Sequence, residues 1–318
     1  MSEVHPWVSS HLEKPGFGLT ITGGGDWPAL RETVQAYEEL GFDSVWMPDH
    51  PLLGWDSWTL LAGLAEATSR IRLGTMVTCV YYRNPVQLAR VVADVDRISG
   101  GRVVLGIGSG DMPWEFEQMG LAYPPPAERA VALERALQVV PALLRGEAVG
   151  GAQLRPPAAQ QPHVPILVAG GGAKTTLPLA ARFADANNMA AASWAGGAFT
   201  PEDARRKLET LDRLLAEAGR PREAVLRTTQ AGFVLADSPE QAAAMQEAVR
   251  SDPVRARIMD FLEKIPSYCT PAEAVERVRS LQAAGYQYFV LPGADMRNVR
   301  RLVDEVIAPL RELASSPG

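Results

Sequence analysis

The sequence predicts an α/β fold, a (β/α)8 TIM barrel, and three observations support this prediction. Short apolar runs alternate with longer segments of helical periodicity along almost the whole chain. The apolar runs lack polar alternation, as expected of strands that are buried on both faces of a parallel sheet. Eight such strand–helix units occur, and right-handed connections close eight units into a barrel. An open, doubly wound sheet is the alternative, but no shift in composition divides the chain into two halves.

The expected strands are short, apolar or β-branched, and bounded by turn residues. They span 17–21, 44–47, 71–79, 102–107, 165–169, 188–192, 225–235 and 288–291. The expected helices are amphipathic, and several open with a proline after a capping residue, as at Thr200-Pro201. They span 27–40, 57–68, 85–99, 128–144, 174–184, 201–218, 239–249, 271–284 and 296–310.

We expect a single catalytic domain over residues 16–318, preceded by a loose leader over residues 1–15. His5 and His11 fall in this leader, far from any cluster of cysteines or carboxylates, so a metal site is not expected there. Insertions are expected after the fourth and seventh strands. The first includes the irregular stretch 146–165, which is rich in Gly, Pro, Ala and Gln, and the second includes residues 251–268.

Composition excludes several classes of partner. The chain of 318 residues has 31 Lys and Arg against 37 Asp and Glu, a net charge of −6, which argues against a nucleic-acid surface. No stretch approaches the roughly 18 apolar residues of a membrane span. The two cysteines, Cys79 and Cys269, lie far apart, as is usual in a reducing cytoplasm. We therefore expect a cytoplasmic protein that acts on a small molecule and has no metal, nucleic-acid or membrane partner.

The second expected strand is followed by Pro48-Asp49-His50-Pro51. In a TIM barrel the chemistry occurs at the carboxyl ends of the strands, so this pair would place a carboxylate and an imidazole at the barrel mouth. Histidine exchanges protons near neutral pH, and His50 alone of the four histidines follows a strand in this way. An aspartate that caps a turn beside a surface histidine is the alternative. We predict that His50 is catalytic.

The fourth expected strand ends in a glycine-rich loop, Gly-Ile-Gly-Ser-Gly-Asp, that finishes at Asp111. The loop resembles the dinucleotide-binding fingerprint, but Asp111 stands where the last glycine belongs, and the strand is fourth instead of first. We predict that Gly108, Ser109 and Gly110 let a flat ring approach the backbone. Asp111 and Glu115 are candidate catalytic carboxylates. The alternative for Glu115 is an ordinary acid in the first turn of a helix.

The fifth expected strand runs into Ala-Gly-Gly-Gly-Ala-Lys, which ends at Lys174 and precedes a helix. Consecutive glycines at the start of a helix expose N–H groups to an anion. The pattern is not a nucleotide P-loop, because the earlier glycine is missing and Lys174 follows an alanine. A tight turn is the alternative. We predict that a cofactor phosphate binds the backbone of Gly170, Gly171, Gly172 and Ala173.

Aromatic residues gather near the same junctions. Trp46 lies inside an expected strand and is assigned to the core. Trp55, Trp58 and Tyr82 lie in loops or at their ends, where they suit the wall of an apolar pocket that binds a ring.

As a set, these junctions resemble the luciferase-like flavin and deazaflavin oxidoreductases. The resemblance covers nearly the whole chain, from Phe17 to Leu310, and implies a barrel of the luciferase type. The matching segments are 40–50, 70–75, 82–85, 99–102, 105–108, 166–172, 182–185, 270–273 and 284–285.

Within this family, Asp-His after the second strand is typical of the branch that uses the deazaflavin coenzyme F420. The resemblance implies that Asp49 contacts the deazaflavin ring and that His50 faces the substrate. It also implies a bulge with a non-proline cis peptide behind the ring, at Met76-Val77 and before Thr78. Asp111 matches a glutamate that lies near the pyrimidine edge of the ring in the related sugar-phosphate dehydrogenases.

The glycines at 170–172 match the loop that holds the cofactor phosphate, but two other features depart from those dehydrogenases. They carry a glutamate after the first strand, where this chain has Thr22-Gly-Gly-Gly25. The lysines that grip their substrate phosphate have no clear match. A sugar phosphate is therefore not expected as substrate, and the lid geometry over 146–165 is not predicted.

The sequence thus predicts an F420-dependent oxidoreductase that transfers a hydride between the cofactor and a small organic substrate. His50 would exchange a proton with the substrate, and Asp111 or Glu115 would balance charge near the ring. One alternative is an FMN-dependent luciferase-like monooxygenase supplied with reduced flavin by a partner reductase. Another is a cofactor-binding protein without turnover. The resemblance also implies a homodimer, with helices around the second to fourth strands as the interface.

Overall fold

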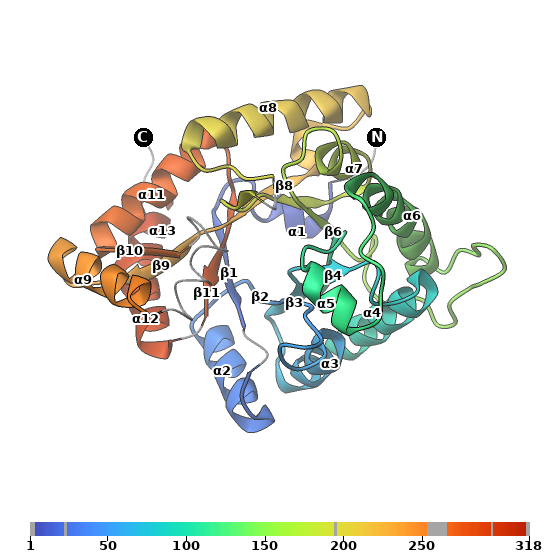
Figure 1. The fold of residues 1–318 in the computed structure, drawn as a ribbon, viewed down its shortest axis with the longest axis horizontal. Coiled ribbons are helices and arrows are strands. Elements are labelled where there is room, and N and C mark those ends of the chain that lie inside the picture. Colours follow the sequence, from blue (N-terminus) through green and yellow to red (C-terminus); the bar gives the residue numbers. More distant parts are fainter. Residues whose placement is uncertain (1–3, 22–23, 194–195, 253–265, 294, 316–318) are drawn as a thin grey trace.

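The computed structural model describes residues 4–21, 24–193, 196–252, 266–293 and 295–315. The sequence features at 1–3, Thr22-Gly23 and 253–265 lie outside the described residues. Figure 1 shows a ring of strands surrounded by helices, which confirms the predicted TIM barrel.

Parallel strands form the closed barrel, and each pairs with its neighbours on both sides. The first strand, β1, pairs with the last, β11, and β3 pairs with β5 to complete the ring. The strands are β1 (Gly16–Thr20), β2 (Ser44–Met47), β3 (Arg72–Thr75), β5 (Val103–Gly108), β6 (Ile166–Ala169), β7 (Ala186–Asn188), β8 (Leu226–Gln230) and β11 (Tyr288–Pro292).

The helices cover the outside of this ring (Figure 1). Their ends follow from local sequence: Asn84 caps one N-terminus by accepting from the N–H of Val86, and Thr270 and Glu273 form a capping box at another. No helix in the described part of the chain is long and apolar enough to cross a bilayer. The outer helices are α2 (Trp27–Glu39), α3 (Ser57–Ala67), α4 (Pro85–Ser99), α6 (Pro126–Leu144), α7 (Thr176–Phe183), α8 (Pro201–Glu217), α11 (Pro271–Ala284), α12 (Met296–Arg301) and α13 (Ala308–Ser315), with a π-helical turn at Leu302–Ile307 between the last two.

The expected strands 71–79 and 225–235 are each interrupted. The first divides into β3 and the short β4 (Thr78–Cys79), separated by Met76 and Val77, whose peptide bond is cis as the resemblance implies. The second divides at Ala231 into β8 and β9 (Gly232–Leu235). β9 leaves the barrel and pairs with β10 (Pro266–Cys269), a strand that the sequence analysis missed because it is short and opens with proline.

Both expected insertions are present. The first, after β5, holds the short helix α5 (Pro113–Gln118), which was not predicted, then α6 and the irregular stretch after it. That stretch contains a single antiparallel bridge, between Val149 and Ala152. The second insertion, after β8, holds β9, α9 (Pro239–Arg250), β10 and α11.

The expectation of a loose leader is wrong for described residues 4–15. They include a one-turn helix, α1 (Pro6–Ser9), capped by His5, whose Nδ1 accepts from the N–H of Trp7. Trp7 and Val8 are buried inside the barrel, where they pack with side chains of the strands. The rings of Trp7 and Tyr288 meet edge to face, 6.0 Å apart. This segment therefore closes the end of the barrel at which the strands begin.

Replacing Trp7 with alanine should lower the free energy of unfolding by about 3–5 kcal/mol, because it leaves a cavity inside the barrel. Leu12→Ala is the matched control, since Leu12 is 36% exposed and the change should cost under about 1 kcal/mol. Urea unfolding measures both. Equal small losses would show that residues 4–15 do not contribute to the core.

Candidate active site

A cavity of about 540 Å³ opens at the carboxyl ends of the barrel strands. Its size is that of a pocket for a cofactor or a small ligand. Most of the residues predicted from sequence line it: Asp49, His50, Met76, Val77, Gly108, Ser109, Gly110, Asp111, Gly170 and Gly172. The other predicted residues do not line the cavity: Thr78, Glu115, Gly171 and Ala173.

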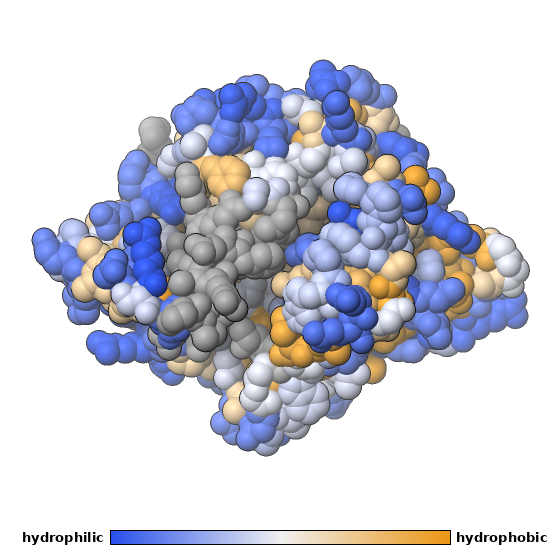
Figure 2. Space-filling view, viewed as in Figure 1, coloured by the Kyte–Doolittle hydropathy of each residue, from blue (hydrophilic) through white to orange (hydrophobic). Residues whose placement is uncertain are grey.

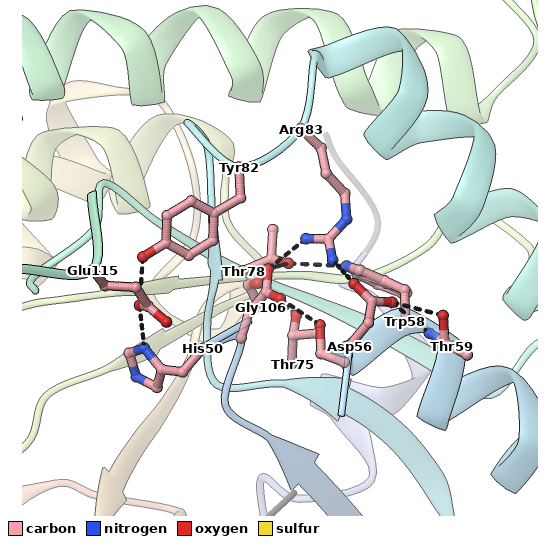
Figure 3. Close-up of polar contacts among 12 residues, drawn as sticks. His50, Asp56, Trp58, Thr59, Thr75, Thr78, Tyr82, Arg83, Gly106 and Glu115 are labelled. Atoms are coloured by element: carbon pink, nitrogen blue, oxygen red, sulfur yellow. Dashed lines mark hydrogen bonds and ion pairs between the residues drawn. The ribbon is translucent and has the colours of Figure 1, made fainter. Parts of the chain in front are cut away.

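His50 lies at the cavity wall and is held from behind by a buried carboxylate (Figure 3). Its Nδ1 lies 2.9 Å from Oε2 of Glu115, which also accepts a 2.7 Å hydrogen bond from the hydroxyl of Tyr82. The other oxygen of Glu115 accepts from the N–H of Leu52 at 3.3 Å. Burial and then the bond to Glu115 raise the pKa of Tyr82, so this phenol stays protonated and donates.

The structure corrects the role expected for Glu115. Its side chain is fully buried and does not reach the cavity wall, so it cannot touch a ligand there. Its hydrogen bond orients the ring of His50, and Tyr82 completes its own hydrogen bonding. The helix that carries Glu115, α5, begins at Pro113, shortly after the Asp111 loop.

Asp49 forms part of the cavity wall, but both of its oxygens already accept hydrogen bonds from the protein. Oδ1 accepts from Ser57, and Oδ2 accepts from Thr78 at 2.6 Å and from Arg83 at 2.7 Å. Arg83 also pairs with Asp56 (Figure 3). Burial lowers the pKa of Arg83, but the two carboxylates outweigh it and raise the value. Asp49 therefore joins the end of β2 to β4, α3 and the turn before α4.

The hydroxyl of Thr78 is engaged in hydrogen bonds within the protein. It donates to Asp49 and accepts from the indole N–H of Trp58 at 2.9 Å, and both side chains are buried. Neither Thr78 nor Trp58 contacts the cavity, contrary to expectation, because each faces the packing between strands and helix. Trp55 also lies off the cavity, 39% exposed, with its N–H bonded to the carbonyl of Gly25. Of the three expected wall aromatics, only Tyr82 lines the cavity.

The glycines of the 108–111 loop are required by the protein's own packing. A Cβ at Gly108 would lie 2.7 Å from Val77, and one at Gly110, where φ is +81°, would lie 2.9 Å from Sγ of Cys79. Asp111 lines the cavity beside them. Burial raises the pKa of Asp111, and the charge of Glu115 adds to the rise, while His50 and Arg129 oppose it.

In the 170–173 loop, two of the four expected N–H donors are already used. The N–H of Gly170 donates to the carbonyl of Asn188, and that of Gly172 donates to the hydroxyl of Thr176, both at 2.8 Å. Gly171 is buried away from the cavity, and its carbonyl accepts from Lys207 at 2.9 Å. The loop therefore offers an anion fewer backbone N–H donors than its run of glycines indicates.

Sequence analysis missed six polar residues of the cavity wall: Arg129, Thr175, Thr176, Asn188, Ser193 and Gln230. Thr175 and Thr176 bring hydroxyls to it at the start of α7, and a helix start after a glycine run is a signal that could have identified them. Arg129 of α6 brings a guanidinium, which donates to the carbonyl of Gly110 and stacks on Tyr123 at 4.5 Å. Its buried Nε has no protein partner among the described residues. Nothing local in the sequence distinguishes it from other helix arginines.

The polar side chains of the cavity determine which chemistry it can support. Within the described ranges, no three His, Cys, Asp or Glu side chains lie close enough together to hold a metal ion. The cavity instead offers an oriented imidazole, a carboxylate with a raised pKa, threonine hydroxyls and a guanidinium. Such a set can bind an organic molecule and exchange a proton with it.

The luciferase-like monooxygenase family matches residues 10–309, almost the whole chain. The chain belongs to this family. It is 30% identical over 316 residues to an F420-dependent glucose-6-phosphate dehydrogenase of Nakamurella multipartita, a match that covers 88% of this chain and 91% of that one. It is 31% identical over 217 residues to a 5,10-methylenetetrahydromethanopterin reductase of Archaeoglobus fulgidus, which covers 65% of this chain and 60% of the relative.

Solved structures share the fold of this luciferase-like chain at low sequence identity. The F420-dependent tetrahydromethanopterin reductase of Methanopyrus kandleri has a TM-score of 0.76 at 20% identity, covering 93% of this chain and 99% of that one. A riboflavin lyase solved with modified FMN has a TM-score of 0.78 at 15% identity, covering 96% of this chain and 93% of that one. These structural similarities establish the fold. They do not identify the cofactor, which has to be inferred from the residues of the site.

Replacing Asp111 with asparagine should stabilise the fold at pH 7. Because the folded-state pKa of Asp111 is raised, its ionised form is disfavoured in the folded protein, and stability is lost as pH rises through that pKa. The asparagine variant should melt about 2 °C higher at pH 7, and the difference should vanish as pH falls below about 3, where Asp111 is mostly protonated in both states. A Tm difference that does not change with pH would contradict this.

Proposed function

We propose that the protein is an F420-dependent oxidoreductase that transfers a hydride between the deazaflavin and a small organic substrate. The observation that carries the proposal is the imidazole of His50, which lines the 540 Å³ cavity at the barrel mouth and is held from behind by the buried carboxylate of Glu115. Support for the cofactor comes from the relatives, because an F420-dependent dehydrogenase aligns over 88% of the chain.

The lining of the cavity fits such a cofactor. Met76 and Val77 give one apolar wall for a flat ring, and the backbone of the Gly108–Asp111 loop borders it. The hydroxyls of Thr175 and Thr176 lie at the start of a helix, where an anionic group is favoured. The Nε–H of Arg129, which has no partner in the described part of the chain, is a donor that a bound acceptor atom would satisfy. These residues would hold the ring and the phosphate.

A bound deazaflavin supplies hydride transfer at carbon five of its ring. The protein supplies orientation and the proton. With Nδ1 of His50 bonded to Glu115, the ring presents Nε2 as the nitrogen that exchanges a proton with the oxygen or nitrogen of the substrate. The buried carboxylate of Glu115 stabilises the imidazolium, and Tyr82 keeps that carboxylate in place.

An FMN-dependent monooxygenase is the second candidate, because similar proteins include a 4-hydroxyprotoasukamycin monooxygenase of Streptomyces nodosus, 30% identical over 46% of this chain and 37% of that one. A binding protein without turnover is the third, and the oriented His50 argues against it, since ligand binding alone does not need a buried carboxylate behind a histidine.

The cofactor is tested by titration with oxidised and reduced deazaflavin and with FMN, followed by fluorescence and oxygen uptake. We expect micromolar or tighter binding of the deazaflavin and turnover without oxygen consumption. Tight binding of FMN with oxygen uptake, and none of deazaflavin, would replace this proposal with the monooxygenase.

His50→Ala should keep cofactor binding and lower turnover by about 10²–10⁴-fold, the usual contribution of a positioned acid or base. Turnover is followed by deazaflavin absorbance with whichever of a panel of small alcohols, amines and imines reacts fastest with the wild type. Trp55→Ala is the control, because Trp55 lies off the cavity. A parallel loss of cofactor affinity and rate in His50→Ala would make His50 a binding residue instead.

Thr175→Asp tests the phosphate site, with the isosteric and neutral Thr175→Asn as its control. Thr175 is exposed and lines the cavity, whereas a Cβ at the neighbouring Gly171 would lie 2.8 Å from the backbone oxygen of Gly196 and disturb the fold. A carboxylate about 4 Å from the phosphate repels it by about 1–4 kcal/mol, so deazaflavin affinity should fall about 5-fold or more below that of the asparagine variant. Equal affinities would place the phosphate elsewhere.

Assembly and location complete the proposal. We propose a homodimer that uses the α3–α4 side of the barrel, where Val86 and Ile98 of α4 are 37% and 50% exposed. Figure 2 shows hydrophobic residues gathered over the α3–α5 region of the face it presents.

A cytoplasmic location is supported by the two cysteines, Cys79 and Cys269, both of which are buried and free.

A further inference from the structure

The N-terminal segment, residues 4–15, contains two of the four histidines of the chain, His5 and His11. Both residues are buried, with 2% and 8% of their surface exposed. Because the segment precedes the first residue of β1, it lies at the amino ends of the barrel strands, whereas His50 follows a carboxyl end. The proposed hydride transfer therefore uses neither histidine.

The contacts of His5 require a neutral imidazole. Its Nδ1 accepts the N–H of Trp7 at 3.1 Å, which is the bond that caps α1. Its Nε2 lies 3.1 Å from the carbonyl oxygen of His163 and donates to it. An imidazole that accepts at one nitrogen and donates at the other carries no charge. A proton on Nδ1 would set an N–H against the N–H of Trp7, so protonation breaks the cap.

The titratable groups that face His5 do not compensate for a charge there. They are His163, whose ring lies 5.0 Å away, Asp185 and Arg72. The carboxylate of Asp185 is already occupied, because it accepts from the ring of His163 at 3.0 Å and from the N–H of Ile166 at 2.9 Å. Burial lowers the pKa of His5, and His163 and Arg72 add to this, while Asp185 and the carbonyl of His163 oppose it.

His11 is enclosed in a similar way. Its ring meets the ring of Tyr288 edge to face, 4.9 Å apart. The charged groups that face it are Asp43, Arg72 and Arg311, so cations outnumber carboxylates around the imidazole. Burial lowers the pKa of His11, and the two arginines add to this, while Asp43 and a backbone carbonyl oppose it. The segment is thus seated on two histidines that are both neutral.

The rest of the attachment is apolar packing. Trp7 and Val8 pack inside the barrel with side chains of the strands. The backbone–backbone hydrogen bonds that the structure describes for residues 5–12 are all internal to the segment. The barrel itself closes through the pairs β1–β11 and β3–β5. The segment can therefore leave without breaking the hydrogen bonds between the strands, which makes a local opening feasible.

We propose that residues 4–15 form a pH-sensitive plug, which stays in the barrel while His5 and His11 are neutral and leaves when they take up protons. In a released segment, histidine titrates near pH 6.5, so below about that pH the released form binds more protons than the seated form. The seated form is therefore most stable above about pH 6.5 and loses stability as the pH falls further. Release uncovers the apolar interior of the barrel at its amino end and leaves His50 in place.

Hydrogen–deuterium exchange followed by mass spectrometry tests the release in the full chain, with rates corrected for the intrinsic effect of pH. Between about pH 7.5 and about pH 5, the protection of the amides in residues 5–12 should fall by about 10–100-fold, because each proton taken up on release contributes up to about a factor of ten per pH unit. Protection of β5 should change by less than about 3-fold, since the opening is local.

Two variants remove the titrating groups and keep the contacts. His5→Asn retains an oxygen that can cap α1, because asparagine is a preferred capping residue. His11→Phe retains an aromatic edge against Tyr288. Each alone should reduce the loss of protection, and the double variant should keep protection within about 3-fold over the same pH range. His50→Gln is the matched control, because it removes a histidine at the other end of the barrel and should show the full loss of the wild type.

Three results would overturn the proposal. They are protection of residues 5–12 that does not depend on pH, a parallel loss in β5, which indicates global acid unfolding, and an undiminished loss in the double variant. If the double variant does not fold, His5→Asn decides, and a loss equal to that of the wild type refutes the role of His5. Because none of these measurements needs deazaflavin or turnover, their outcome is independent of the proposed function.

Discussion

The hydrogen bond between His50 and the buried carboxylate of Glu115 is the interaction on which the candidate site depends. A carboxylate with no exposed surface is costly unless donors surround it, and here they come from separate segments: His50 and Leu52 after β2, and Tyr82 after β4. Each donor must stay in place for the others to be stable. The same arrangement that satisfies Glu115 therefore fixes the imidazole at the cavity wall.

A second buried carboxylate reinforces this arrangement from the other side. Asp49 precedes His50 and accepts from Ser57, Thr78 and Arg83. Adjacent residues of one loop are thus anchored in two directions, one toward α5 and one toward α3 and β4. The scaffold below is equally constrained, because Trp7 of the N-terminal segment fills the barrel interior against Tyr288. A site needs such rigidity if it is to hold a ring and a substrate within reach of one proton.

The sequence was sufficient for the barrel, because buried parallel strands and amphipathic helices repeat with distinct periods. It also located His50, Asp111 and the glycine loops, because in this fold every strand end faces one mouth. It could not assign Glu115, since spacing does not reveal whether an acid in the first turn of a helix points into a cavity or behind a histidine.

The other features that the sequence did not predict have the same cause. They depend on contacts between residues that are far apart in the sequence. Trp7 and Val8 have no periodicity that marks a barrel plug, and the one-turn helix that carries them is defined by its packing. Arg129 reaches the carbonyl of Gly110 from a helix that begins at Pro126. The donors of Gly170 and Gly172 are consumed by Asn188 and Thr176, which only the folded loop brings near.

We propose that Glu115 and His50 act as one unit. A double-mutant cycle on the turnover of deazaflavin tests it most directly, using Glu115→Gln, His50→Ala and the combined variant. If Glu115 works through His50, the combined variant should be no slower than His50→Ala alone. Glu115→Gln should retain the cofactor affinity of the wild type. Rate losses that multiply, so that the combined variant falls by the product of the two single effects, would show independent roles and contradict the account.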